Sequence, residues 1–194
     1  MQSNSLLYAG VDISAGRRPV SFAALDEDSN IVILEKWDIP TVLEYLREHD
    51  NVSLMINLST SKIGQSVRED FKNQISQAGF KSLSQKDQPK RWFETNTQDC
   101  YREWIGKSPL PRRTLEGRLQ RSLVLYEQAL RIEDPMDIFE EITRYKLIQG
   151  SFRLENIYSS KELDALAAAY LAWMTVNRPQ QIVVNGEFFL PAPR

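Results

Sequence analysis

The hydrophobic residues of the first sixty positions fall into short runs that turn-forming residues separate. Residues 5–12, 19–25 and 31–37 alternate or run apolar and are rich in β-branched and aromatic side chains, while "SAGRR" and "DEDSN" lie between them. This pattern predicts three strands in a meander. The run "NVSLMINLS" is almost wholly apolar, which is typical of a central strand covered on both faces.

A short helix is predicted between the third and fourth strands. The segment "TVLEYLREH" has apolar residues at helical spacing and Thr41 as its candidate N-cap. Because a strand that follows a helical crossover lies parallel to its partner, we expect the fourth strand beside the first. Asp12 and Asn57 then end at one edge of the sheet, about 5 Å apart by strand spacing.

The rest of the chain predicts helices, a short strand and a closing hairpin. The short strand is "FKSL", and "QIVVNGEFFLP" predicts a hairpin over 181–190 with a type I′ turn at Asn185 and Gly186. The predicted helices cover 65–78 before Gly79, 97–106, 114–130 with Thr114 as N-cap, 134–150 from Asp134 to Gly150, and 159–174 with a Ser159/Glu162 capping box.

Length and composition favour one domain over residues 1–194, with a core sheet at 5–83, a helical half at 97–177 and the hairpin after it. No apolar run is long enough to cross a bilayer and the N-terminus has no basic leader, so a cytoplasmic protein without membrane association is expected. The single Cys100 excludes an internal disulfide. The single His49 excludes a two-histidine zinc motif and is expected to contact the last carbonyls of the first helix.

The net charge of −2 gives no overall preference for a polyanion, but charge is uneven along the chain. Cations outnumber acids between Lys86 and Arg121, and a nucleic acid could contact this basic segment, a solvated face being the alternative. Arg118 and Arg121 share a helix face and are candidate phosphate ligands. Arg144 and Lys146 in "TRYK" are similar candidates, with solvated surface charges again the alternative.

Asp12 ends an apolar strand, where a carboxylate either holds a metal ion or phosphate or starts a loop. Five segments, the first of which contains Asp12, resemble one family: "YAGVDIS", "TLEGRLQRSLVLYE", "DPMDIFEEITRYK", "KELDALAAAYLAW" and "NGEFFLPAP". Together they are similar to the family of domain of unknown function 429, whose members are predicted RNase H-like nucleases. The resemblance implies an α/β, RNase H-like fold with a mixed five-stranded sheet flanked by helices, plus the C-terminal β-hairpin.

The resemblance also implies a site. Asp12 matches the acid of the first strand and Asp164 the acid of the last helix, and such proteins bind two Mg²⁺ or Mn²⁺ ions and hydrolyse phosphodiester bonds. Asn57 occupies the strand end where a third acid is usual. Its amide oxygen can coordinate a metal but brings no charge, although two ions require three or four carboxylates. The resemblance therefore implies an attenuated or inactive nuclease.

A replacement acid can come from the preceding helices. Glu127, at the end of "LVLYE", is the candidate third catalytic acid, and Glu116, Glu140 and Glu141 are alternatives, each otherwise a solvated helix charge. Two other functions stay open. One is a non-catalytic nucleic-acid or protein-binding module on the same fold. The other is an actin-like phosphotransferase, because "GVDISAG" is similar to the first phosphate loop of that superfamily, although those enzymes use two such domains.

Overall fold

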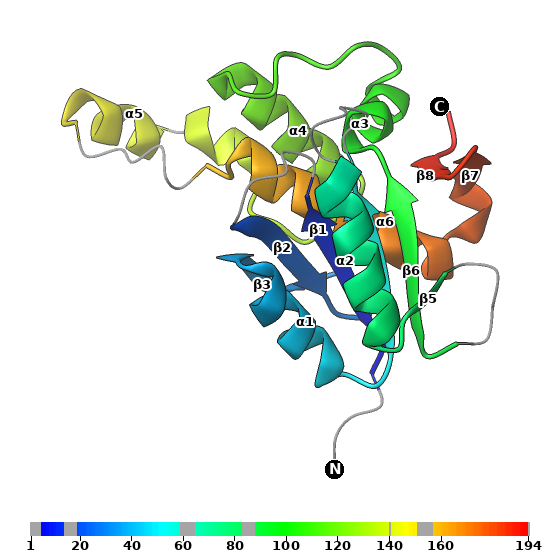
Figure 1. Cartoon of the computed structure of the whole chain (residues 1–194). Helices are drawn as coiled ribbons and strands as arrows, with labels where there is room; N and C mark the ends of the chain where they lie inside the picture. Colours follow the sequence, from blue (N-terminus) through cyan, green and yellow to red (C-terminus); the bar gives the residue numbers. More distant parts are fainter. Residues whose placement is uncertain are drawn as a thin grey trace.

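The computed structural model describes residues 5–13, 19–58, 65–82, 88–139, 141–150 and 157–193. The predicted turn "SAGRR", Lys86 and Glu140 lie outside these residues. The elements follow the chain in this order (Figure 1): β1 (Leu7–Asp12), β2 (Val20–Leu25), β3 (Ile31–Trp37), α1 (Ile39–Arg47), β4 (Val52–Asn57), α2 (Gln65–Gln77), β5 (Lys81–Ser82), β6 (Lys90–Thr95), α3 (Thr97–Ile105), α4 (Leu115–Glu127), η2 (Pro135–Phe139), α5 (Glu141–Ile148), α6 (Ser160–Asn177), η4 (Pro179–Gln181), β7 (Ile182–Asn185) and β8 (Phe188–Pro191).

The strands form one mixed sheet of eight strands in the order β3-β2-β1-β4-β6-β8-β7, with β5 beside β6. The predicted meander is confirmed, since β1, β2 and β3 pair antiparallel. The predicted parallel pairing of β4 with β1 is also confirmed. The prediction of five strands is wrong, because the sequence pattern omitted β6 and treated the hairpin as an addition, whereas β8 pairs parallel with β6 and extends the sheet.

β6 escaped prediction because three of its six residues are charged, which hides its alternation. It lies inside the sheet, between β4 and β8. Its Glu94 is only 5% exposed, and its carboxylate pairs with Arg68 at 2.6 Å and with Lys72, both from α2. Cations from a distant helix therefore stabilise a charge that would otherwise disfavour a central strand.

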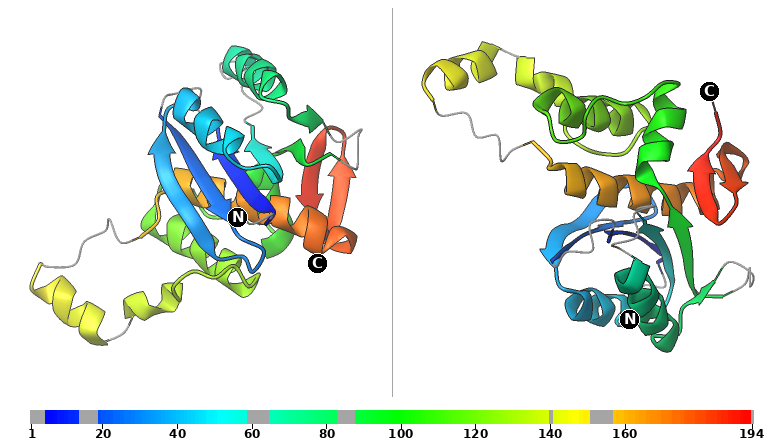
Figure 2. Two further views of the ribbon diagram at one scale, coloured as in Figure 1. Left: turned by 90° about the horizontal axis from the view of Figure 1, so that it is seen from below. Right: turned by 45° about the horizontal axis from the view of Figure 1, so that its top comes forward.

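Helices cover both faces of the sheet (Figure 2). α6 packs on β1, β2 and β4, with α3 and α4 around it, and α1 and α2 cover the opposite face. Side chains of β1 alternate between these two cores, so Tyr8 and Asp12 face α6 while Leu7, Ala9 and Val11 face α1 and α2. No helix within the described ranges is both long enough and apolar enough to span a membrane.

β1 and α6 approach each other closely where Gly10 faces the alanine-rich side of the helix. A Cβ atom at Gly10 would lie 2.2 Å from the carbonyl oxygen of Ala165 and 2.2 Å from the backbone nitrogen of Ala169. Glycine is therefore required at this position for steric reasons. Asp12 lies two residues further along the same face, so this contact also sets how closely α6 approaches the end of β1.

Most predicted helix boundaries agree with the structure. Thr114 caps α4, and Ser159 and Glu162 form the capping box of α6. The cap of α1 was predicted wrongly, because the N-cap is Asp38 and not Thr41. The side chain of Asp38 accepts a hydrogen bond from the backbone N–H of Thr41 at 3.0 Å. The helix can begin before Pro40 because proline is tolerated in the first turn, where its missing N–H is not needed.

Two other local predictions need correction. The single helix over 134–150 is a 3₁₀ helix, η2, followed by α5, and α5 packs on η2 rather than on the sheet. Without packing on the sheet, little stabilises one continuous helix. The hairpin turn consists of Gly186 and Glu187, and Gly186 alone has positive φ, 63°. This matches a type II′ turn, which needs glycine at its first position, rather than type I′.

Candidate functional site

Polar side chains gather where β1, β4 and β6 end. In the parallel register Asp12 lies beside Asn57, and Asn57 lies beside Thr95. Asp12 and Asn57 are each 2% exposed. The carboxyl ends of parallel strands meet at one edge of a sheet, where ligands of α/β proteins commonly bind. The predicted juxtaposition of Asp12 and Asn57 is therefore present.

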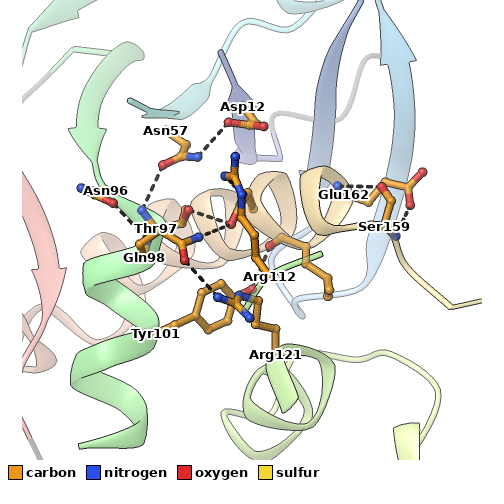
Figure 3. A network of polar contacts seen from close by, with 12 residues as sticks. Asp12, Asn57, Asn96, Thr97, Gln98, Tyr101, Arg112, Arg121, Ser159 and Glu162 are labelled. Carbon is orange, nitrogen blue, oxygen red and sulfur yellow. Dashed lines mark hydrogen bonds and ion pairs between the residues drawn. The ribbon is translucent and has the colours of Figure 1, made fainter. Parts of the chain in front are cut away.

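Asn57 connects Asp12 to the start of α3. Its side-chain Nδ2 donates a hydrogen bond to Asp12 Oδ1 at 2.8 Å, and its Oδ1 accepts the backbone N–H of Thr97 at 2.9 Å (Figure 3). A backbone N–H can only donate, so it fixes which end of the amide faces Asp12. Asn57 thus presents its NH₂ group to the acid, and its oxygen is engaged by the backbone.

The third predicted residue, Asp164, lies in the first half of α6 and is fully buried. Its Oδ1 accepts hydrogen bonds from Thr97 Oγ1 at 2.8 Å and from Gln98 Nε2 at 3.3 Å. Its Oδ2 lies 3.4 Å from Arg112 Nη1. Because Thr97 also donates its N–H to Asn57, one residue links the strand ends to the acid of α6. The structure brings Asp12, Asn57 and Asp164 together.

Sequence reasoning missed Thr97, Gln98 and Arg112 as residues of this site. Asn96 caps α3 by accepting the N–H of Gln98 at 3.1 Å, and this cap orients the first turn of the helix toward α6. The helix over 97–106 was predicted, but its place beside Asp164 depends on β6 being a strand. In the sequence, only the capping residue Asn96 at the start of this helix could have pointed to these residues.

Burial is the main cause that raises the pKa of Asp164, to about 7, and the negative charge of Asp12 raises it further. The hydrogen bond from Thr97 and the charges of Arg112 and Arg121 oppose this effect. Two acids brought together under these conditions favour the binding of a proton or another cation.

The raised pKa predicts that the metal-free protein becomes less stable as the pH rises from about 4 to about 7. An acid whose pKa is higher in the folded state than in the unfolded state makes its full contribution to the stability of the fold at pH values below its unfolded pKa. For Asp164, this contribution is lost as the pH rises through about 7. One proton gives at most about 1.4 kcal/mol per pH unit. Urea unfolding in EDTA measures this slope. Asp164→Asn should flatten it, whereas Asp70→Asn, at an exposed acid of α2, should not. An unchanged slope in Asp164→Asn contradicts the prediction.

Arg121 is not available as a phosphate ligand, contrary to prediction. It is 1% exposed, and its Nη1 donates to the carbonyls of Leu110 at 2.9 Å and Gly117 at 2.8 Å. Its Nη2 donates to Gln98 Oε1 at 2.9 Å, and its guanidinium lies over the ring of Tyr101. Arg121 therefore holds Gln98 in position for Asp164.

The other predicted phosphate ligands do not reach the acids either. Arg118 donates to the carbonyls of Tyr158, at 2.7 Å, and Ile157, so it holds the segment that leads into α6. Arg144 and Lys146 are exposed on α5, which stands away from the sheet in both views of Figure 2. The structure does not bring these residues to the site.

Glu127 does not join the two acids. It is exposed at the last residue of α4, whereas Arg121, the α4 residue that reaches this site, lies nearly two turns earlier. Glu116 is also exposed, and the side chains of Glu140 and Glu141 lie outside the described residues. The charged residues that affect the pKa of Asp164 are Asp12, Arg112 and Arg121.

The donor set suits one divalent cation better than two. Among the described residues, no three His, Cys, Asp or Glu side chains form a group that could hold a metal. Asp12 and Asp164 supply two negative charges and oxygen donors, which hard cations prefer. Two ions would need further carboxylates, and the oxygen of Asn57 accepts from Thr97 instead.

Comparison of the chain with protein-family models, with curated proteins and with solved structures finds no match. The fold and the site alone therefore define the class: a mixed α/β protein with an eight-stranded sheet, helices on both faces, and a pair of buried acids at the carboxyl edge of its central strands.

Proposed function

We propose that this chain is an RNase H-like domain of the domain of unknown function 429 family and acts as an attenuated, metal-dependent phosphodiesterase on nucleic acid. The strand arrangement supports the fold, since three antiparallel strands, a crossover helix, a fourth strand parallel to the first and a late helix bearing an acid are its elements. The observation that carries the activity is Asp164, buried beside Asp12 with a pKa raised to about 7.

In this proposal Asp12 and Asp164 hold one Mg²⁺ or Mn²⁺ ion. Such an ion, when bound, stabilises the charge that develops on the oxygens of the phosphodiester during attack by water. Asn57 orients Asp12, and Thr97 and Gln98 orient Asp164. These hydrogen bonds fix both carboxylates before any ligand binds, so little reorganisation is needed.

The proposal includes attenuation because the charge of the site is low. Asn57 contributes no carboxylate and directs its NH₂ group at Asp12. Arg112 offsets one of the two negative charges through its ion pair with Asp164. A metal ion that binds here must either displace the guanidinium of Arg112 or bind beside its positive charge. Either way the affinity of the site for the ion is lowered.

The experiment compares wild type, Asp12→Asn and the control Asp70→Asn, with and without Mn²⁺. Mn²⁺ at about ten times its Kd should stabilise wild type by about 1.4 kcal/mol, which raises Tm by roughly 3–6 °C for a chain of this size. A labelled oligonucleotide should be cleaved slowly. Asp12→Asn should lose both effects and Asp70→Asn neither. No Mn²⁺-dependent rise in the Tm of wild type contradicts the proposal.

A specific observation favours a second function, a non-catalytic binding module for nucleic acid or protein. The amide of Asn57 and the guanidinium of Arg112 already supply donors and positive charge to the two acids. A site stabilised in this way keeps the fold without a metal ion. Oligonucleotide binding without metal-dependent stabilisation or cleavage would favour this module.

A further inference from the structure

One loop beside the two acids is rich in positive charge, and it is a short part of the basic segment predicted between Lys86 and Arg121. Residues 106–114, "GKSPLPRRT", connect α3 to α4 and contain three cations, Lys107, Arg112 and Arg113, and no acid. The loop thus carries a charge of +3 in a chain whose net charge is −2.

Other cations of the predicted basic segment have local partners. Lys90 donates to two carbonyls at the end of α1, Arg102 pairs with Asp99 at 2.7 Å, and Arg118 and Arg121 donate to backbone carbonyls. These side chains stabilise the fold rather than forming a surface for a polyanion. Within the part of the chain that the structure describes, neither Lys107 nor Arg113 forms an ion pair, and both are exposed.

The backbone of this 106–114 loop is held on α4. Arg121 donates to the carbonyl of Leu110, and the N–H of Leu110 donates to Gln120 Oε1 at 2.8 Å. Thr114 donates through both its N–H and its hydroxyl to the carbonyl of Pro111. With prolines at 109 and 111, the loop is pre-organised, so a ligand need not order it on binding.

Arg112 joins the loop to the acids. It extends toward the site in Figure 3, and its Nη1 lies 3.4 Å from Asp164 Oδ2. Its side chain remains 37% exposed, so the guanidinium keeps donors that a ligand can reach. A guanidinium with exposed donors matches a phosphate group in geometry and charge.

We propose that the 106–114 loop is the surface that holds the phosphate backbone of a single nucleic-acid strand at this site. Arg112 contacts the phosphate nearest the two acids, and Lys107 and Arg113 contact neighbouring phosphates. The inference rests on the proposed function only in its choice of a phosphodiester ligand, because the loop binds phosphate with or without cleavage.

The test measures binding of a labelled single-stranded oligonucleotide in EDTA by fluorescence anisotropy at several salt concentrations. The variant is Lys107→Ala with Arg113→Ala. The control, Arg47→Ala with Lys81→Ala, removes the same charge from exposed residues at the opposite end of the sheet, where α1 ends and β5 pairs with the start of β6. Both variants should keep the Tm of wild type, since all four side chains are exposed.

The loop variant should lose roughly tenfold in affinity, and its slope of log affinity against log salt should fall by about 1.4, because two phosphate contacts are lost from a single strand. The control should change neither quantity. Arg112→Gln, added to the loop variant, should weaken oligonucleotide binding further. Equal losses in loop variant and control, or no binding by wild type at low salt, overturn the inference.

The result is separable from the test of the proposed function. Binding that depends on the loop, without Mn²⁺-dependent stabilisation, supports the inference and contradicts catalysis. If the loop variant binds the oligonucleotide as tightly as wild type and still cleaves it with Mn²⁺, the inference is contradicted and the proposed function stays in place.

Discussion

Gly10→Ala should destabilise the protein by about 3 kcal/mol or more, which lowers Tm by roughly 6–12 °C for a chain of this length. The added methyl group would lie 2.2 Å from backbone atoms of Ala165 and Ala169. Backbone atoms cannot rotate away as a side chain can, so β1 and α6 must separate. Thermal and urea unfolding of the variant measure the loss.

The backbone origin of this clash provides the control. Gly10→Ala combined with Ala169→Gly should be at least as unstable as Gly10→Ala alone, because the second change leaves the nitrogen of residue 169 in place and puts a glycine inside α6. Recovery of stability in the double variant would contradict the explanation. The separation of α6 from β1 would also move Asp164 away from Asp12, so any Mn²⁺-dependent stabilisation should weaken together with the fold.

Asn57→Asp should have the second large effect, and its sign should depend on pH and metal. The substitution preserves size and keeps an acceptor for the N–H of Thr97, but it replaces the donor that lies 2.8 Å from Asp12 Oδ1 with an oxygen. At about pH 8 without metal, the uncompensated buried charge should cost about 3 kcal/mol or more. Urea unfolding measures this loss.

Protonation should reverse this loss. Neighbouring negative charges raise the pKa of the new carboxyl in the folded state, so its destabilising effect should be large above that pKa and should diminish as the pH falls toward about 5. Mn²⁺ should restore stability at pH 8 by mass action and should stabilise the variant more than wild type. Cleavage of an oligonucleotide should rise in parallel.

The matched control is Asn73→Asp, at an exposed asparagine of α2, which adds the same charge on the face of the sheet opposite α6. It should be nearly neutral at both pH values and indifferent to Mn²⁺. If Asn57→Asp gains no stability from Mn²⁺, the metal site is contradicted and the binding module is favoured. If Asn57→Asp is as stable as wild type at pH 8 without metal, the electrostatic account of the site is wrong.

Much of the fold was predictable because its determinants are local. Apolar alternation gave β1 to β3, the apolar run gave β4, and the crossover helix between β3 and β4 gave the parallel pairing of β1 with β4. The contact of His49 Nδ1 with the carbonyl of Tyr45, at 2.9 Å, was also predictable, because it spans only four positions at the C-terminal end of α1. The strands and the His49 contact depend on neighbours within one turn or one strand, and the parallel pairing follows from the helical crossover between β3 and β4.

The candidate site was predictable only in part. Strand ends and the family resemblance located Asp12, Asn57 and Asp164. The proposed roles of Arg121 and Glu127 failed, because the sequence gives the spacing of helix residues and not their partners. Arg121 is directed into the protein by the carbonyls of Leu110 and Gly117, and Glu127 is exposed.

The sequence by itself therefore determined the caps of α4 and α6, the strands of the meander and the meeting of Asp12 with Asn57, since each follows from spacing along the chain. Only the tertiary structure decided that β6 is a central strand, because its buried Glu94 depends on cations of α2. It also decided that Thr97, Gln98 and Arg112 surround Asp164, since these contacts join residues 52 to 67 positions apart. Contacts across such separations depend on how whole elements pack, and no local spacing encodes them.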